Sequence, residues 1–106
     1  MAAPVRFTVA AGADARSITD RYRDVASSDT AASFANALRR AVRGIRLFPS
    51  AGSPRYGALV GIPGLRHIHV KGFPYLVFYK ETGDVVWVWR ILHAASDIPT
   101  WLLGDK

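Results

Sequence analysis

The sequence predicts an α+β domain in which two amphipathic helices cover a small antiparallel sheet. Residues 64–93 contain three apolar runs separated by breaks that carry glycine, which is typical of strands joined by tight hairpins. Residues 12–48 instead repeat apolar side chains every three or four positions, as amphipathic helices do. A sheet this apolar needs a cover, and the two helices can supply it.

The length and composition limit the class of protein. The chain has 106 residues and no cysteine, which fits one domain spanning residues 1–106 without a disulfide, a thiolate nucleophile or a Cys-ligated metal. Residues 1–10 lack the basic start and apolar run of a secretory signal, and no run approaches the roughly 20 apolar residues of a membrane span. We therefore expect a soluble cytoplasmic protein that does not contact the membrane.

The first two elements expected are a strand and a helix. Val5, Phe7 and Val9 alternate with polar neighbours, which predicts a half-buried strand over residues 4–10. The helical spacing then begins and continues to about Ala26. The strand must join the later sheet, either at its edge or as a neighbour.

A second helix follows a short turn at residues 27–29, whose side-chain oxygens can cap its first amides. Because the connection is short, the two helices should form an antiparallel hairpin. The second helix should end near Phe48, since Pro49 lacks an amide hydrogen and disfavours helical geometry in the residue before it. Its polar side carries a basic stripe of Arg39, Arg43 and Arg46.

The rest of the chain should form a loop, a meander and a last helix. Residues 49–63 hold three prolines and three glycines and are expected to be a loop. Three consecutive antiparallel strands follow within residues 64–93. Asp97 can cap a short final helix that carries Pro99 in its first turn.

The formal net charge is +6, and the positive charge is concentrated in the middle of the chain. No acidic residue lies between Asp29 and Glu81, although many arginines and lysines do. Such a segment favours a negatively charged partner, either nucleic acid or an acidic protein. A solvated basic surface that only keeps the protein soluble is the alternative.

Standard catalytic and metal motifs are absent from the sequence. There is no P-loop, dinucleotide fingerprint, paired-carboxylate motif or HExxH motif. His67 and His69 should share one face of a strand, but no third metal ligand is evident from the spacing. The alternative to a metal pair is two hydrogen-bonded histidines of the sheet. We expect neither a metal nor a cofactor.

Arg66, Arg90 and His93 are the most suggestive set for binding or chemistry. Each arginine lies in an apolar strand, where desolvation is unfavourable unless the guanidinium meets an anion or reaches the sheet edge. With RNA bound, the two arginines can hold the developing charge while His93 or Tyr79 transfers a proton.

The same residues also have a purely structural interpretation. Arg90 can form an ion pair with Glu81 or Asp97, and His93 can hydrogen-bond at the end of its strand. The aromatic side chains nearby fit core and sheet-surface packing better than a platform for stacked nucleobases. They are Tyr75, Phe78, Tyr79, Trp87 and Trp89.

Four short strings occur in a characteristic order along the chain. They are PSAG at residues 49–52, GLR at 64–66, FPYLVFY at 73–79, and RILH at 90–93 followed by Asp97. Together they resemble the RelE/ParE superfamily of toxins from type II toxin–antitoxin systems, over nearly the whole chain. The resemblance implies a small toxin that a cognate antitoxin, ParD-like or related, neutralises in a hetero-oligomer. Such antitoxin segments are often acidic, in agreement with the basic middle of this chain.

The superfamily contains two activities, and the strings FPYLVFY and RILH look more like the ParE-like branch. That branch inhibits DNA gyrase by binding to it and is not a nuclease. The alternative, RelE-like branch cleaves messenger RNA on the ribosome without a metal, but the lysines expected before Arg66 are missing here. The resemblance implies target contacts by Arg66, Arg90 and His93, with Tyr79 added in a nuclease. Ser96 departs from the family pattern, so a member that has lost toxicity is a third possibility.

Overall fold

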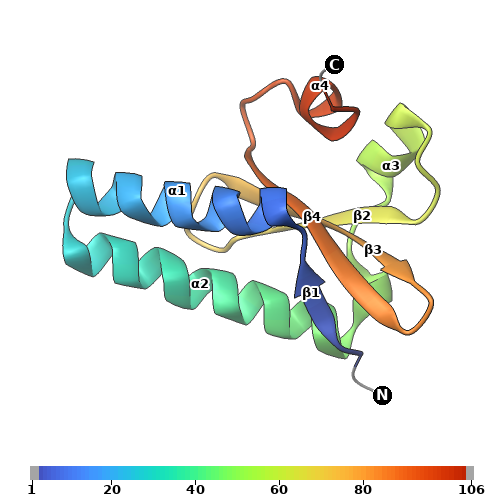
Figure 1. The fold of residues 1–106 in the computed structure, drawn as a ribbon, viewed down its shortest axis with the longest axis horizontal. Helices are drawn as coiled ribbons and strands as arrows, with labels where there is room; N and C mark the ends of the chain where they lie inside the picture. The colour runs from blue at the N-terminus through green and yellow to red at the C-terminus, as the bar shows by residue number, and fades with distance from the viewer. Residues whose placement is uncertain (1–2, 105–106) are drawn as a thin grey trace.

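The computed structural model describes residues 3–104, and Met1, Ala2, Asp105 and Lys106 of the expected domain lie outside the described residues. The elements are β1 (Val5–Phe7), α1 (Val9–Val25), α2 (Ser28–Leu47), a 3-10 turn (Pro49–Ala51), α3 (Arg55–Val60), β2 (Leu65–His69), β3 (Tyr75–Thr82), β4 (Val85–His93) and α4 (Ile98–Leu102). The expected α+β class is confirmed, with an N-terminal strand, a helical hairpin, a meander and a short last helix (Figure 1). Within the described part, no helix combines the length and apolar character needed to cross a membrane.

The sheet is mixed and has the strand order β1-β4-β3-β2. Strands β2, β3 and β4 form the expected antiparallel meander. Strand β1 joins at the edge and runs parallel to β4, from Val5 opposite Val86 to Phe7 opposite Val88. The chain must cross over the sheet between these two parallel strands, and the helical hairpin lies within that connection.

The first strand is shorter than the sequence predicts, because α1 begins at Val9 rather than near residue 12. The hydroxyl of Thr8 accepts a hydrogen bond from the amide of Ala11, so Thr8 is the N-cap of the helix. The apolar alternation continues past Phe7 in the sequence, but this capping interaction ends the strand there.

The helical hairpin of α1 and α2 covers one face of the sheet (Figure 1). Ser27 caps α2 through the amide of Thr30, and α2 ends at Leu47, as the proline that follows predicts. The main core lies between this hairpin and the sheet. Its buried members are Ala11, Ile18, Phe34, Ala37, Leu38, Ile45, Val70, Val77, Tyr79, Val86, Val88 and Ile91.

A second, smaller core brings α4 and the α3 segment together with other residues of the strands. The expectation of a plain loop over residues 49–63 was wrong, because α3 forms within it. Helix α3 packs so tightly on β2 that a Cβ at Gly57 would collide with the carbonyl of Leu65. As predicted, Asp97 caps α4, and Pro99 lies in the first turn. The buried members are Leu65, Leu76, Phe78, Leu92, Ile98 and Leu102.

A β-bulge interrupts the pairing of β3 with β4. Tyr79 pairs with Val88 but Phe78 pairs with Arg90, so Trp89 is an extra residue on β4. Simple alternation along the strand would place Arg90 on the face of Val88. The bulge instead gives Arg90 the face of Phe78, which belongs to the smaller core.

Candidate functional site

Strand β1 stops pairing with β4 at Val88. Beyond this point, residues at the start of α1 bind the backbone of β4 instead. The amide of Thr8 donates to the carbonyl of Val88 (3.0 Å), and its hydroxyl donates to the carbonyl of Trp89 (2.9 Å). Further along the strand, a carboxylate oxygen of Asp14 accepts from the amide of Ile91 (2.9 Å). Side chains at the helix start therefore satisfy backbone groups that a longer β1 would have paired.

Asp14 also holds Arg90 in a bidentate ion pair. The Nε atom of Arg90 lies 2.7 Å from Oδ2 of Asp14, and Nη2 lies 2.9 Å from Oδ1. The two side chains are only 22% and 15% exposed, and the guanidinium carbon lies 5.1 Å from the ring centre of Trp101. An internal ion pair of Arg90 is confirmed, but its partner is Asp14 rather than Glu81 or Asp97.

Arg66 and Tyr79 hold the loop that follows α2. The buried hydroxyl of Tyr79 donates to the carbonyl of Pro49 (2.8 Å) and accepts from the amide of Gly52 (3.0 Å). Nη1 of Arg66 donates to the carbonyl of Gly52 (2.8 Å). Burial raises the pKa of Tyr79, so its proton is retained at neutral pH. Both polar groups are committed to positioning the backbone of this loop.

His93 is exposed at the end of β4. Its Nδ1 accepts a hydrogen bond from the amide of Ala95 (3.0 Å), as the structural interpretation expected, so the neutral ring carries its proton on Nε2. The imidazole packs edge-on against Tyr75, with 5.2 Å between ring centres. It is thus presented at the surface in one orientation.

Arg66, Arg90 and His93 do not converge on one point. Arg66 lies opposite Tyr79 in the β2–β3 ladder, whereas Arg90 lies opposite Phe78 in the β3–β4 ladder. Directly opposed residues share a face, and successive residues of a strand point to opposite faces. The two arginines are therefore on opposite faces of the sheet.

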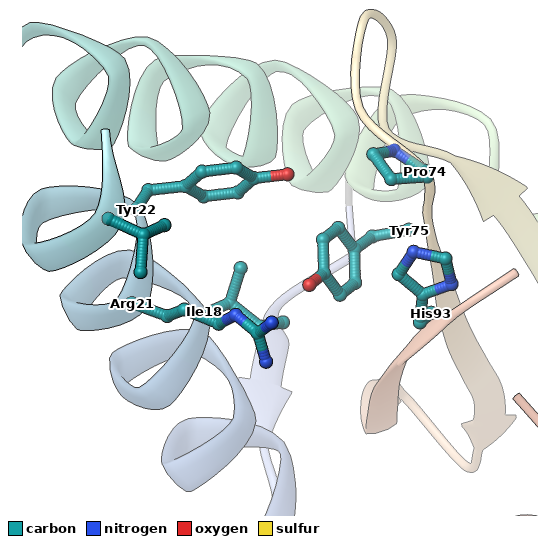
Figure 2. Close-up of a pocket in the computed structure, with 7 residues that line it drawn as sticks. Ile18, Arg21, Tyr22, Pro74, Tyr75 and His93 are labelled. Atoms are coloured by element: carbon teal, nitrogen blue, oxygen red, sulfur yellow. The ribbon is translucent and has the colours of Figure 1, made fainter. Parts of the chain in front are cut away.

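A cleft of about 470 Å³ opens between α1 and the ends of β3 and β4 (Figure 2). It is lined by Ile18, Arg21, Tyr22, Val25, Pro74, Tyr75 and His93. An adjoining hollow of about 220 Å³ shares Ile18, Tyr75 and His93 with it and continues to Asp14, Arg90 and Trp101. We call the two together the α1–β4 groove.

One wall of the cleft is an aromatic cluster with free polar tips. Tyr22, Phe34, Phe73 and Tyr75 pack with ring centres 5.3 to 6.3 Å apart. Neither tyrosine hydroxyl has a hydrogen-bond partner within residues 3–104. Burial, and then the neighbouring Tyr75, raises the pKa of Tyr22, while Arg21 opposes the shift. Figure 2 shows Arg21 and Tyr75 extending toward the same space.

The other residues considered from the sequence lie away from this groove. Arg39, Arg43 and Arg46 are exposed on α2, and none of them lines the groove. His67 packs against the rings of Tyr56 and Phe78, whose centres are each 5.3 Å from its own. Its Nδ1 is buried without a hydrogen-bond partner, so the expected hydrogen-bonded histidine is wrong at this position. No three His, Cys, Asp or Glu residues in the described chain are grouped to hold a metal.

Sequence reasoning singled out His93 and Arg90, which line the groove, but it missed the residues that α1 contributes. Spacing places Ile18 and Tyr22 on the apolar face of the first helix, but nothing in the sequence indicates that the sheet leaves part of that face open. The only signal for Asp14 is a carboxylate among the apolar residues at the start of a helix. Its partner Arg90 is 76 residues further along the chain, which spacing does not predict.

The fold is that of the RelE/ParE class of small toxins, with a helical hairpin on one face of a mixed sheet. A solved structure described as "Chromosomal ParDE TA system from P. aeruginosa" is similar, with a TM-score of 0.72 and 20% sequence identity. The similarity covers 86% of this chain and 95% of that chain. At this identity the comparison establishes the shared fold.

The family follows from the sequence comparison. Residues 5–98 match the family model described as the ParE toxin of the type II toxin–antitoxin system parDE. The chain belongs to this family, so the expected membership of the ParE-like branch is confirmed. No curated protein matches the chain significantly in sequence.

Proposed function

We propose that this ParE-type toxin inhibits DNA gyrase by binding to it in the cytoplasm, without cutting nucleic acid. The observation that carries the choice is the separation of Arg66 from Arg90, since only Arg90 and His93 line the same hollow. Metal-free cleavage of RNA needs a proton acceptor, a proton donor and cations around one phosphate. The two arginines lie on opposite faces of the sheet, and the Tyr79 hydroxyl is buried against the loop after α2. This arrangement favours a binding inhibitor over a ribosome-dependent nuclease.

The proposed partner is a cognate antitoxin that forms a hetero-oligomer with the toxin. The family description names a toxin–antitoxin system, and the similar solved structure is described as a ParDE system. The net charge of +6 favours a partner segment that carries negative charge.

We propose different roles for the residues singled out from the sequence. His93 is exposed and can touch the target directly. Arg66 and Arg90 act by positioning, because their guanidinium groups hold a loop carbonyl and a carboxylate. The basic stripe of α2 supplies exposed charge for the approach to a gyrase–DNA complex, since long-range attraction accelerates such encounters. Its members are Arg39, Arg43 and Arg46.

A gyrase supercoiling assay with the purified toxin tests the proposal directly. Supercoiling should fall as toxin is added and should recover when antitoxin is present in excess. Full supercoiling activity at a large excess of folded toxin would overturn gyrase as the target.

Induction in cells separates the other two possibilities. Cuts in messenger RNA that follow codon positions after induction would support the ribosome-dependent nuclease instead. Normal growth on induction without the antitoxin gene would indicate a family member that has lost toxicity.

A further inference from the structure

We propose that the outer face of the helical hairpin binds the phosphates of double-stranded DNA. We call this surface the arginine face, and it consists of Arg16 of α1 with Arg39, Arg40, Arg43 and Arg46 of α2, all of them exposed. The contact does not require gyrase to be present. The inference therefore rests on the proposed function only in the choice of DNA as the duplex.

Helical spacing places the α2 arginines on the solvent side of the helix. Phe34 and Ile45 are buried in the main core. Arg39, Arg43 and Arg46 follow one another at intervals of four and three residues on the exposed side. From Arg39 to Arg46 the helix rises roughly 10 Å. This length matches about three phosphates of one DNA strand, which follow at about 3.4 Å along the duplex axis.

The positive charge of these arginines is not neutralised within residues 3–104. The two ion pairs of the described chain involve Arg23 and Arg90 instead. Arg39 donates to the amide oxygen of Asn36 (2.6 Å), which leaves the charge of the guanidinium in place. The only acidic residue of α2 is Asp29 in its first turn, roughly 15 Å from Arg39 along the helix. The arginine face is therefore available to an anion.

Two simpler explanations account for only part of this surface. A cation in the last turn of a helix interacts favourably with the helix dipole, but this effect is confined to that turn and so applies to Arg46. A surface that only keeps a protein soluble normally mixes charges of both signs. Residues 30–47 of α2 contain four arginines and no carboxylate. Charge of one sign on one helix face is characteristic of nucleic-acid binding.

The arginine face continues onto α1 beside a hollow of about 380 Å³. Residues of both helices line this hollow, among them Arg16, Arg23 and Arg39. Asp20, the one carboxylate among the described lining residues, is bound by Arg23 at 2.8 Å. Arg16 has no ion pair in the part of the chain that the structure describes. Arg16 and Arg39 thus present positive charge on two sides of a hollow that can accept a phosphate group.

The composition of the arginine face favours a duplex over a single strand or an acidic peptide. Guanidinium groups bind phosphate in a bidentate manner. Single strands are usually held by aromatic stacking, but Phe34, the one aromatic residue of α2, is fully buried. An amphipathic peptide needs apolar anchors, and the arginine face itself has none. Contacts with phosphates alone predict binding without sequence preference.

A double variant tests the arginine face against a control with the same change in net charge. Arg39→Gln with Arg43→Gln removes two charges from the face. Arg6→Gln with Lys71→Gln removes two charges from exposed positions of β1 and the β2–β3 turn. All four positions are exposed, so the fold should persist, as circular dichroism can confirm.

Binding is measured by fluorescence anisotropy, with the full-length toxin and a labelled DNA duplex of about two helical turns, over a series of NaCl concentrations. For the wild type, log Kd should rise with log salt with a slope of about 3–4. The arginine-face variant should lower this slope by about 2 and weaken the Kd at least about tenfold at 0.1 M salt. The control should keep the slope and stay within about threefold. Two duplexes of unrelated sequence should bind equally well.

Three results would overturn the inference. The first is equal weakening of DNA binding in the arginine-face variant and the control. The second is tighter binding of duplex or single-stranded RNA than of duplex DNA. The third is displacement of the DNA by polyglutamate as readily as by unlabelled duplex, which would indicate an acidic protein as the partner.

The supercoiling assay separates this inference from the proposed function. Gyrase inhibition by a toxin that binds no free DNA would refute the inference and leave gyrase as the target. DNA binding through the arginine face by a toxin that does not inhibit gyrase would support the inference and refute gyrase as the target.

Discussion

Tyr79 and His67 lie on adjacent strands, and they show two different environments of a polar group in an apolar strand. The hydroxyl of Tyr79 is satisfied on both sides by the loop after α2. The Nδ1 of His67 is buried without any partner. Satisfied polar groups specify a local structure, whereas a buried titratable group whose pKa is shifted makes stability depend on pH.

Tyr79→Phe should lower the free energy of unfolding by about 1–3 kcal/mol, because the buried amide of Gly52 loses its acceptor. Urea denaturation measures the loss. Tyr56→Phe is the matched control, since the Tyr56 hydroxyl makes no hydrogen bond in the described chain, and its effect should stay within about 0.5 kcal/mol. Equal losses in the two variants would contradict the anchoring role of Tyr79.

His67 should make stability decrease in mildly acidic solution. Burial, and then the positive charge of Arg55, lowers its pKa in the folded protein below the ordinary value of 6.5. The unfolded chain therefore takes up the proton first as the pH falls through 6.5, and stability is lost from there down to the folded pKa. Tm measured from neutral pH down to about pH 5 should fall more for the wild type than for His67→Gln. His69→Gln, at an exposed histidine, is the control and should behave like the wild type. If Tm falls equally with pH in the wild type and in His67→Gln, the assignment to His67 is contradicted.

At the scale of elements, the edge of β4 depends on α1 rather than on another strand. Strand β1 pairs only as far as Val88. Beyond this point, Thr8 and Asp14 form hydrogen bonds with backbone groups of β4. The bulge at Trp89 turns Arg90 toward the same carboxylate. Asp14 therefore joins the helix start to the sheet through both a backbone amide and a guanidinium.

Asp14→Ala should lower the free energy of unfolding by about 2–4 kcal/mol, since it removes the carboxylate that the largely buried guanidinium of Arg90 and the amide of Ile91 both bind. The matched control is Asp20→Ala, which breaks an exposed ion pair with Arg23 and should change stability by about 0.5 kcal/mol or less. Thermal and urea unfolding measure both variants. Similar losses of stability in Asp14→Ala and Asp20→Ala would show that the carboxylate of Asp14 does not link α1 to β4.

The sequence predicted the long elements well because periodicity is a local property. The hairpin, the meander and the Asp97 cap all follow from side chains a few residues apart. Helix α3 was missed because Pro54 and Gly57 read as a loop, although glycine is needed there for close packing on β2. The bulge at Trp89 leaves no pattern that alternation could detect.

At the scale of the whole molecule, the net charge could be predicted from the sequence, but the partners of the individual charged side chains could not. The positive balance is evident from composition, and the basic stripe of α2 is exposed as helical spacing implies. The roles of Arg66 and Arg90 depend on partners far along the chain. Arg66 reaches Gly52 and Arg90 reaches Asp14, so both have internal partners. For Arg90 the sequence had left a ligand and an internal ion pair as open alternatives, and it had not indicated Asp14 as the partner. Only the folded chain brings these groups together.

The net charge of +6 should make antitoxin association sensitive to salt. The association rate constant, measured by stopped flow, should fall roughly tenfold between low salt and about 0.5 M NaCl, because screening removes the attraction at a distance. The dissociation rate constant should change much less, since close contacts are screened weakly. A salt-independent association rate would contradict an acidic partner.

The parallel pairing of β1 with β4 has a consequence for the newborn chain. Val5 lies beside Val86, so the first strand and α1 gain their place only after β4 has been synthesised. Closing so long a loop is slow compared with forming the hairpin or the meander. A chain whose β4 has not yet left the ribosome therefore lacks one wall of the α1–β4 groove, and this surface exists only once the polypeptide is finished.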